Sequence, residues 1–225
     1  MAEHHPHSTP PEAGPAPEAR WPAMIALLAV GVLFWALPEG LSAGPRWLAI
    51  VVVCVLVTLL LLTHGRGHPM IYLALGHLLA GTVTVFMLWS LVLLVLALPA
   101  HRESPVDLLR SGALLWITNV VVFASWYWRL DAGGPHQREK QPGHTKGAFL
   151  FPQMTLHQDL ARERDGRLWS PRFVDYLFLA FNTSTALSPT DAPVLSRWAK
   201  VLVMIQALIS LMVIVILVGR AINMM

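Results

Sequence analysis

The sequence predicts an all-α membrane protein with five to six transmembrane helices, the fifth of them short and either spanning or re-entrant. Hydrophobic residues make up 55% of the 225-residue chain and charged residues only 13%, whereas soluble domains carry about 25% charged residues. Several unbroken Leu/Val/Ala/Ile runs approach or exceed the roughly 20 apolar residues that cross about 30 Å of hydrocarbon. Such segments must be helical, because lipid offers no partner to a free backbone N–H or C=O.

The chain divides into four parts. Residues 1–20 contain five prolines and almost no large apolar side chain, which is typical of a disordered tail. Residues 130–170 form a polar loop, and residues 171–225 comprise a short helix, a turn and a final transmembrane helix. Residues 21–129 hold four predicted transmembrane helices, at 21–37, 47–63, 70–98 and 108–129.

The fifth apolar segment, 173–187, is too short for an ordinary crossing. Its 15 residues extend about 22 Å as a helix, less than the roughly 30 Å of hydrocarbon. The segment therefore either thins the bilayer or stops halfway, and a helix that stops halfway must be buried in protein or line a cavity. The final apolar run, 194–219, is long enough to span.

Hydroxyl groups follow the short apolar segment, and they are the candidate pore residues. They are Thr183, Ser184, Thr185 and Ser188, with Asp191 beyond them. Laid on the potassium-channel filter pattern Thr-x-Thr-Thr-Val-Gly-Tyr-Gly-Asp, the first, third and last of these five residues match. This outline is that of a channel pore loop, and equally that of two ordinary membrane helices joined by a tight turn.

The same stretch departs from a potassium filter at three positions. Ser188 and Thr190 replace the two filter glycines, and Pro189 stands at the tyrosine. Stacked carbonyls need backbone angles that glycine reaches easily, so we expect poor selectivity from any pore. A second interpretation is that Ser188–Pro189–Thr190–Asp191 caps the final helix, because the Ser-Pro-x-Asp pattern that begins at Ser104 also opens the fourth helix.

Four polar side chains lie inside the predicted helices: His77, Asn119, Asn182 and Gln206. Ionisable groups in a membrane indicate function by default, which makes His77 a functional candidate, although it could equally serve packing. Amides commonly hydrogen-bond between helices, and each such bond contributes about 0.6–2 kcal/mol. We expect the three amides to hold helices together.

Basic residues predict the orientation. Eight of the 16 Lys and Arg residues lie in 129–172, so the positive-inside rule places this loop in the cytoplasm. A loop that re-enters from the cytoplasm puts 12 basic residues inside, six full spans put 11 inside, and ordinary potassium-channel topology puts four inside. The charges argue against the last arrangement and do not separate the first two.

Five motifs between residues 116 and 225 resemble an uncharacterised family of bacterial multi-pass membrane proteins. They are found at 126–135, 149–154, 174–177, 186–191 and 220–223. Residues 1–100 resemble that family only in hydropathy. The C-terminal segment is distantly similar to two-helix ion-channel pore modules, and the family itself implies no established activity.

Two functions remain open from the sequence. The first is a degenerate pore-loop channel or transport protein with weak cation selectivity, and the alternative is a non-transporting membrane scaffold or partner subunit. We expect no enzyme activity, catalytic residue, cofactor or metal site. The expected partners are the lipid bilayer, other copies of the chain and monovalent cations, not nucleic acid, and the expected location is the bacterial inner membrane.

Overall fold

The computed structural model describes residues 18–63, 69–100, 104–140, 147–156, 169–185 and 192–222. Helices dominate this part of the chain. Their order is α1 (Trp21–Trp35), η1 (Glu39–Leu41), α2 (Arg46–Thr63), α3 (Pro69–Ala100), α4 (Pro105–Leu130), η2 (Asp131–Gly133), α5 (Pro135–Arg138), η3 (Pro152–Thr155), α6 (Phe173–Thr185) and α7 (Arg197–Ile222).

Four of the described helices are long and apolar enough to cross a membrane: α2, α3, α4 and α7. The shorter α1 is also apolar, and it begins with Pro22 in its first turn, where the missing N–H of proline costs nothing. The predicted helical architecture is thus confirmed, and four of the described helices are compatible with crossing a membrane.

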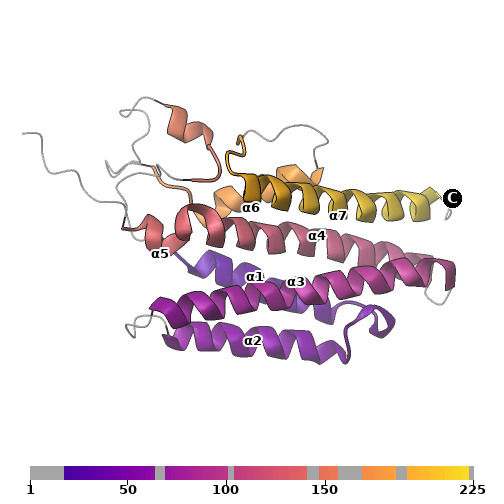
Figure 1. Cartoon of the computed structure of the whole chain (residues 1–225). Coiled ribbons are helices and arrows are strands. Elements are labelled where there is room, and N and C mark those ends of the chain that lie inside the picture. The colour runs from indigo at the N-terminus through magenta and orange to yellow at the C-terminus, as the bar shows by residue number, and fades with distance from the viewer. Residues whose placement is uncertain are drawn as a thin grey trace, which may run out of the picture.

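Helix α4 is the centre of the bundle. It packs against α1, α3, α6 and α7, while α2 packs on α1 and α3 at the outside (Figure 1). Its buried positions include polar as well as apolar side chains, among them Ser111, Thr118 and Asn119. Asn119 donates to the Gln206 carbonyl of α7, whereas Thr118 donates to the Leu114 carbonyl of its own helix.

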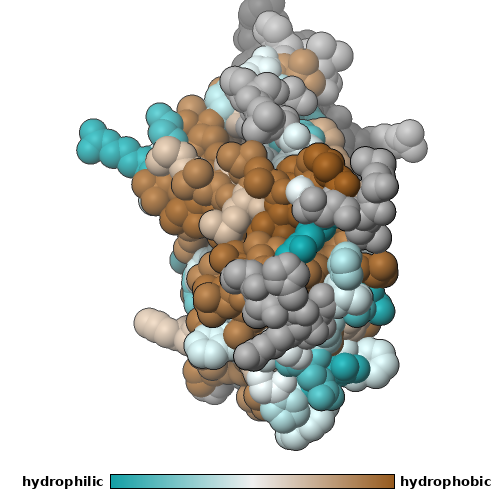
Figure 2. All heavy atoms as spheres, turned by 90° about the vertical axis from the view of Figure 1, so that its right-hand side faces the viewer, coloured by the Kyte–Doolittle hydropathy of each residue, from teal (hydrophilic) through white to brown (hydrophobic). Residues whose placement is uncertain are grey.

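The outer faces of the bundle are apolar. Large hydrophobic side chains are exposed along α2, α3 and α7, including Leu61, Val85 and Leu208. Figure 2, an end-on view, shows hydrophobic residues over much of the surface and hydrophilic residues gathered toward the bottom of the view. In water such a surface would associate, so these faces suit lipid.

Helices α6 and α7 begin at the same end of the bundle. The Phe173 ring of α6 packs on Trp128 near the end of α4, with ring centroids 5.9 Å apart. Just before α7, the Leu195 N–H donates to the carbonyl of Ala148, at 2.7 Å. The Ala148 N–H in turn donates to the carboxylate of Asp131, which directly follows α4.

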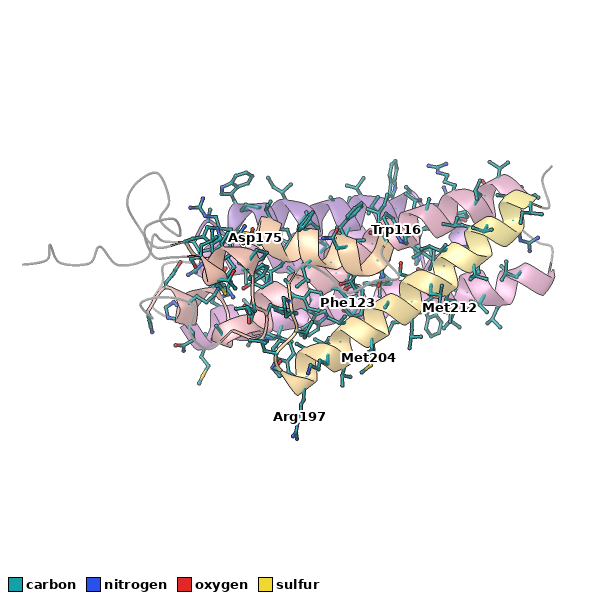
Figure 3. All side chains as sticks on the ribbon, turned by 90° about the horizontal axis from the view of Figure 1, so that it is seen from above. Trp116, Phe123, Asp175, Arg197, Met204 and Met212 are labelled. Carbon is teal, nitrogen blue, oxygen red and sulfur yellow. The ribbon has the colours of Figure 1, made fainter. Side chains whose placement is uncertain are left out.

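The two helices then run in the same direction. Gln206 of α7 donates to the carbonyl of Ala180, and Ser210, one turn further along, donates to the carbonyl of Ser184. Helix α6 ends there after 13 residues, whereas α7 continues for 26. Figure 3 shows α6 running from Asp175 and ending beside Trp116, while α7 crosses obliquely past Met204 and Met212.

Helix α7 reaches the opposite end of the bundle. There the Arg220 guanidinium donates to the carbonyl of Leu98, near the end of α3, at 2.8 Å. Before α7 begins, the chain must therefore return from the tip of α6 to the end of the bundle at which α6 started. The path of that return, residues 186–191, lies outside the described residues.

The start of the final helix corrects the sequence interpretation. Helix α7 begins at Arg197, and the Ser196 hydroxyl accepts a hydrogen bond from the Ala199 N–H at 3.3 Å. Val194, which we expected to be helical, forms an isolated bridge with Phe149 instead. Ser188 therefore does not cap this helix. At Ser104 the capping prediction is confirmed, because its hydroxyl accepts from the Asp107 N–H at 3.1 Å.

Candidate functional site

The hydroxyl string at the end of α6 divides between the bundle interior and its surface. Thr183 and Ser184 are buried, while Thr185 is exposed. The hydroxyls of Thr183 and Thr185 donate to the carbonyls of Leu179 and Phe181, four residues earlier on the same helix. Backbone bonds of this kind satisfy a hydroxyl where water is absent. Only Thr185 therefore faces outward.

Gln206 is the centre of a buried network that joins α4, α6 and α7. Its side-chain N–H groups donate to the Ala180 carbonyl at 2.7 Å and to the Ser184 hydroxyl at 2.9 Å. Its side-chain oxygen accepts from the Tyr127 hydroxyl, and its backbone carbonyl accepts from the Asn119 amide at 3.3 Å. Asn119, Ser184 and Gln206 thus meet, as interhelical hydrogen bonding predicts.

A second pair of contacts closes the tip of α6. The Ser210 hydroxyl donates to the Ser184 carbonyl at 2.7 Å and accepts from the Trp116 indole N–H at 2.9 Å. A helix end leaves four carbonyls unpaired, and inside lipid each would be costly. Sequence reasoning missed Tyr127, Trp116 and Ser210, because aromatic and serine residues in an apolar run carry no signal of their partners.

The other predicted polar residues lie apart from this network. His77 is half-buried on α3, where its Nδ1 lies 2.8 Å from the Leu73 carbonyl and its ring packs on Trp126. Asn182 is half-buried on the face of α6 that borders a small cavity. Ser188 and Asp191, the remaining pore candidates, lie outside the described residues.

A cluster of buried charges, which we did not predict from the sequence, lies where α6 and α7 begin. Asp131, which directly follows α4, is fully buried. Its carboxylate accepts from the Tyr176 hydroxyl of α6 at 2.6 Å and from the Ala148 N–H of the loop. One side chain thereby fixes the entry point of α6 relative to α4.

Arg138 of α5 completes this cluster. Its guanidinium donates to the carbonyls of Trp128 and Asp131 at the end of α4, at 2.8 and 2.9 Å. It also pairs with the carboxylate of Glu18, and the shortest N–O distance is 2.9 Å. Burial raises the pKa of the Glu18 carboxyl, although the Arg138 charge opposes that rise.

Gly134 allows the chain to turn back so that α5 meets the end of α4. Its φ is 88°, and a Cβ at this position would lie 2.8 Å from the carbonyl oxygen of Arg129. Only glycine accommodates both the positive φ and the close approach. The Gly-Gly-Pro sequence after α4 therefore builds the charged cluster and does more than end a helix.

Arg129 is buried between α4 and α3. Its guanidinium carbon lies 5.3 Å from the centroid of the Trp128 ring, and its Nε has no hydrogen-bond partner. The guanidinium fills the space beside Gly76, where a Cβ would lie 2.0 Å from Nη1.

No three His, Cys, Asp or Glu side chains gather as metal ligands within the residues that the structure describes. The described polar contacts are of two kinds. Neutral hydrogen bonds surround Gln206, and the charged cluster around Asp131 lies nearer the end of the bundle where α6 and α7 begin. Comparison of the chain with protein-family models, curated proteins and solved structures finds no match.

Proposed function

We propose that this protein is a weakly selective cation channel or transport protein of the bacterial inner membrane, with α6, the following turn and α7 as its pore module. The observation that carries the proposal is the parallel course of α6 and α7. A short helix that ends inside the bundle, followed by a long helix from the same end, is the arrangement of a re-entrant pore loop. Two ordinary spanning helices would be antiparallel.

The end of α6 favours cations. A helix carries a partial negative charge at its C-terminus, and α6 ends at Thr185 beside Ser210 at mid-bundle. Half-helices that end inside a membrane use such carbonyl ends to coordinate cations in transporters. The proposed path follows the exposed Thr185 and the segment through Asp191, because Thr183 and Ser184 are engaged in packing.

In the proposed topology the four long helices α2, α3, α4 and α7 cross the membrane. The 15-residue α1 and the turn after it bring the chain across before α2, and α6 re-enters from the cytoplasm. This topology agrees with the basic residues, 12 of which it places inside, as the positive-inside rule favours. Selectivity is expected to be poor, because Ser188 and Thr190 stand where a potassium filter has glycine.

Ion flux into liposomes tests this proposal. Purified protein is expected to pass K⁺ and Na⁺ at rates within about tenfold of each other. Asp191→Asn should lower the flux, because it removes the only carboxylate between Thr183 and Asp191. Asp107→Asn is the matched control: this residue lies in the first turn of α4, which Ser104 caps, at the opposite end of the bundle, and flux should be unchanged. Strong K⁺ selectivity, or flux unaffected by Asp191→Asn, would contradict the proposal.

A non-transporting scaffold or partner subunit is the second candidate. The observation in its favour is that Asn119, Ser184 and Gln206 form hydrogen bonds with neighbouring helices. This candidate predicts no flux above that of protein-free liposomes for K⁺, Na⁺ and larger cations alike. It also predicts that Thr185→Val, on the exposed side of α6, changes nothing but stability.

A further inference from the structure

One face of α6 is open to the outside of the bundle, where α6 lies in an outer layer beside α7 (Figure 1). Val174, Phe178 and Phe181 are 64%, 58% and 45% exposed, and the exposed Thr185 completes the row. These four residues, the α6 stripe, are four, three and four positions apart. They therefore lie along one side of the helix, with the spacing of a helix that packs along its length against a second helix.

The α6 stripe ends at the depth where lipid is least able to cover it. The carbonyl of Ser184, next to Thr185, accepts from Ser210, which lies near the middle of the 26-residue α7. The exposed tip of α6 is therefore near the middle of the membrane that α7 spans. A helix end leaves carbonyls unpaired, and irregular backbone at this depth is found only where protein or water covers it.

Asn182 adds a polar side chain at the edge of the α6 stripe. It is half-buried, and within the described residues no hydrogen bond engages its side-chain amide. The middle of α7 is different, because its exposed residues include Met204, Leu208 and Leu211, which suit hydrocarbon. The outer side of α6, rather than that of α7, therefore needs a cover other than lipid.

We propose that a second copy of this chain supplies that cover, with the α6 stripes of two copies packed against each other about a two-fold axis along the membrane normal. All copies share one orientation in the membrane, because the same basic residues orient each of them. A two-fold axis then places every residue of the stripe opposite its own counterpart. The two α6 helices run parallel, and the two Thr185 hydroxyls meet near the axis.

The α6 stripe is complementary to itself. It contains no charged residue, so two copies do not repel each other. The hydroxyl of Thr185 and the amide of Asn182 each offer a donor and an acceptor, so each can bond to its counterpart, as polar side chains do between membrane helices. The ring of Phe181 is already held edge-on by Trp116, with centroids 5.9 Å apart, so little freedom is lost when the stripe packs.

This interface rests on the inward end of α6, which the proposed pore module also uses, but not on conduction. The two are therefore separable by experiment. Cross-linking without ion flux would remove the conduction proposal and support the interface, whereas flux without cross-linking would remove the interface.

Disulfide cross-linking in membranes of the expressing cells tests the interface. A variant with Cys54→Ser and Thr185→Cys, oxidised with copper phenanthroline, should migrate at twice the mass of the chain on a non-reducing gel. A disulfide needs Cα atoms within about 7 Å of each other, which residues facing across a packed seam approach. The wild-type protein is the matched control: Cys54 is exposed near the middle of α2, away from the stripe, and should give no dimer.

A second variant measures the strength of the interface. Phe178→Ala should raise the dissociation constant of the dimer about tenfold, because each copy loses an aromatic contact. Val85→Ala is its control, since Val85 is exposed on α3, and the constant should stay at the wild-type value. Subunit counting by photobleaching in liposomes, at graded ratios of protein to lipid, measures both constants.

Three results would overturn the interface. Cross-linking of Thr185→Cys no greater than that of the wild-type protein would show that lipid or water separates the two helices. A cross-linked product of any other mass would show that a different protein covers α6. Wild-type self-association of Phe178→Ala would exclude the stripe. If Thr185→Cys fails to fold, as judged by circular dichroism, Val174→Cys at the other end of the stripe replaces it.

Discussion

At the scale of single residues, Gly76 provides the space for a buried arginine. The Arg129 guanidinium reaches from α4 to α3 and occupies the position where any larger residue would place its Cβ. A buried guanidinium has little freedom to move aside in a close-packed interior. The absence of a side chain at Gly76 is therefore a packing requirement.

Gly76→Ala is expected to destabilise the protein by about 1–2 kcal/mol relative to Gly81→Ala. Gly81 lies on the same helix, and a Cβ there would meet nothing within 4 Å. The comparison cancels the helix propensity of alanine, which is common to both changes. Unfolding in mixed detergent measures the difference, and equal stabilities would show that Arg129 moves aside freely.

Glu18 has an effect on stability that its place in a proline-rich tail does not suggest. The Glu18 and Arg138 side chains are only 6% and 3% exposed. Glu18→Ala should cost about 3 kcal/mol of unfolding free energy, because it leaves the buried Arg138 guanidinium without the carboxylate that pairs with it. Glu39→Ala is the control: Glu39 pairs with Arg46 at 3.6 Å but is 77% exposed, and such pairs contribute little. Similar losses from both variants would count against this interpretation.

At the scale of helices, the inward end of α6 is stabilised by α7. A helix that stops inside lipid must have its last carbonyls paired. The Ser210 hydroxyl donates to the carbonyl of Ser184, one of those last carbonyls, and Gln206 donates to the Ala180 carbonyl one turn earlier. The hydroxyls of Thr183 and Thr185 bond to their own helix. The polar residues at this point are what allow a short helix to end halfway.

Gln206→Leu tests that role. The change removes both donors to α6 and leaves the Tyr127 hydroxyl without its acceptor. We expect a loss of about 2–3 kcal/mol of unfolding free energy, since a buried group left unpaired costs about 1–3 kcal/mol. Gln137→Leu, at an exposed position on α5, should stay within about 0.5 kcal/mol of the wild type. A mild effect of Gln206→Leu would show that water replaces the lost bonds.

The helices themselves could be predicted from the sequence, because apolar runs and the Ser104 cap are local signals. The shortness of the fifth apolar segment was also visible. The start of α7 was not, because it is set by pairing of residues 148–150 with 193–195, a contact between segments far apart in the chain. The cluster of Glu18, Asp131 and Arg138 was missed for the same reason.

At the scale of the whole molecule, the bundle has two chemically different ends. The end where α6 and α7 begin carries the buried charges around Asp131 and Arg138. The segment 129–172, which begins and ends there, holds eight of the 16 basic residues of the sequence. At the other end, Arg220 reaches the end of α3. The positive-inside rule orients the first end toward the cytoplasm.

The central claim is that α6 is re-entrant: the chain enters the membrane at the start of α6 and returns to the same side before α7 begins. Cysteine labelling tests this claim directly. Single cysteines would be placed at Lys146, Arg197 and Ile222 in a protein whose Cys54 has been replaced. In intact cells, a membrane-impermeant reagent should label Ile222→Cys but neither Lys146→Cys nor Arg197→Cys, and both of these should react after the cells are opened. If Lys146→Cys and Arg197→Cys react from opposite sides, α6 crosses the membrane completely and the re-entrant account is wrong.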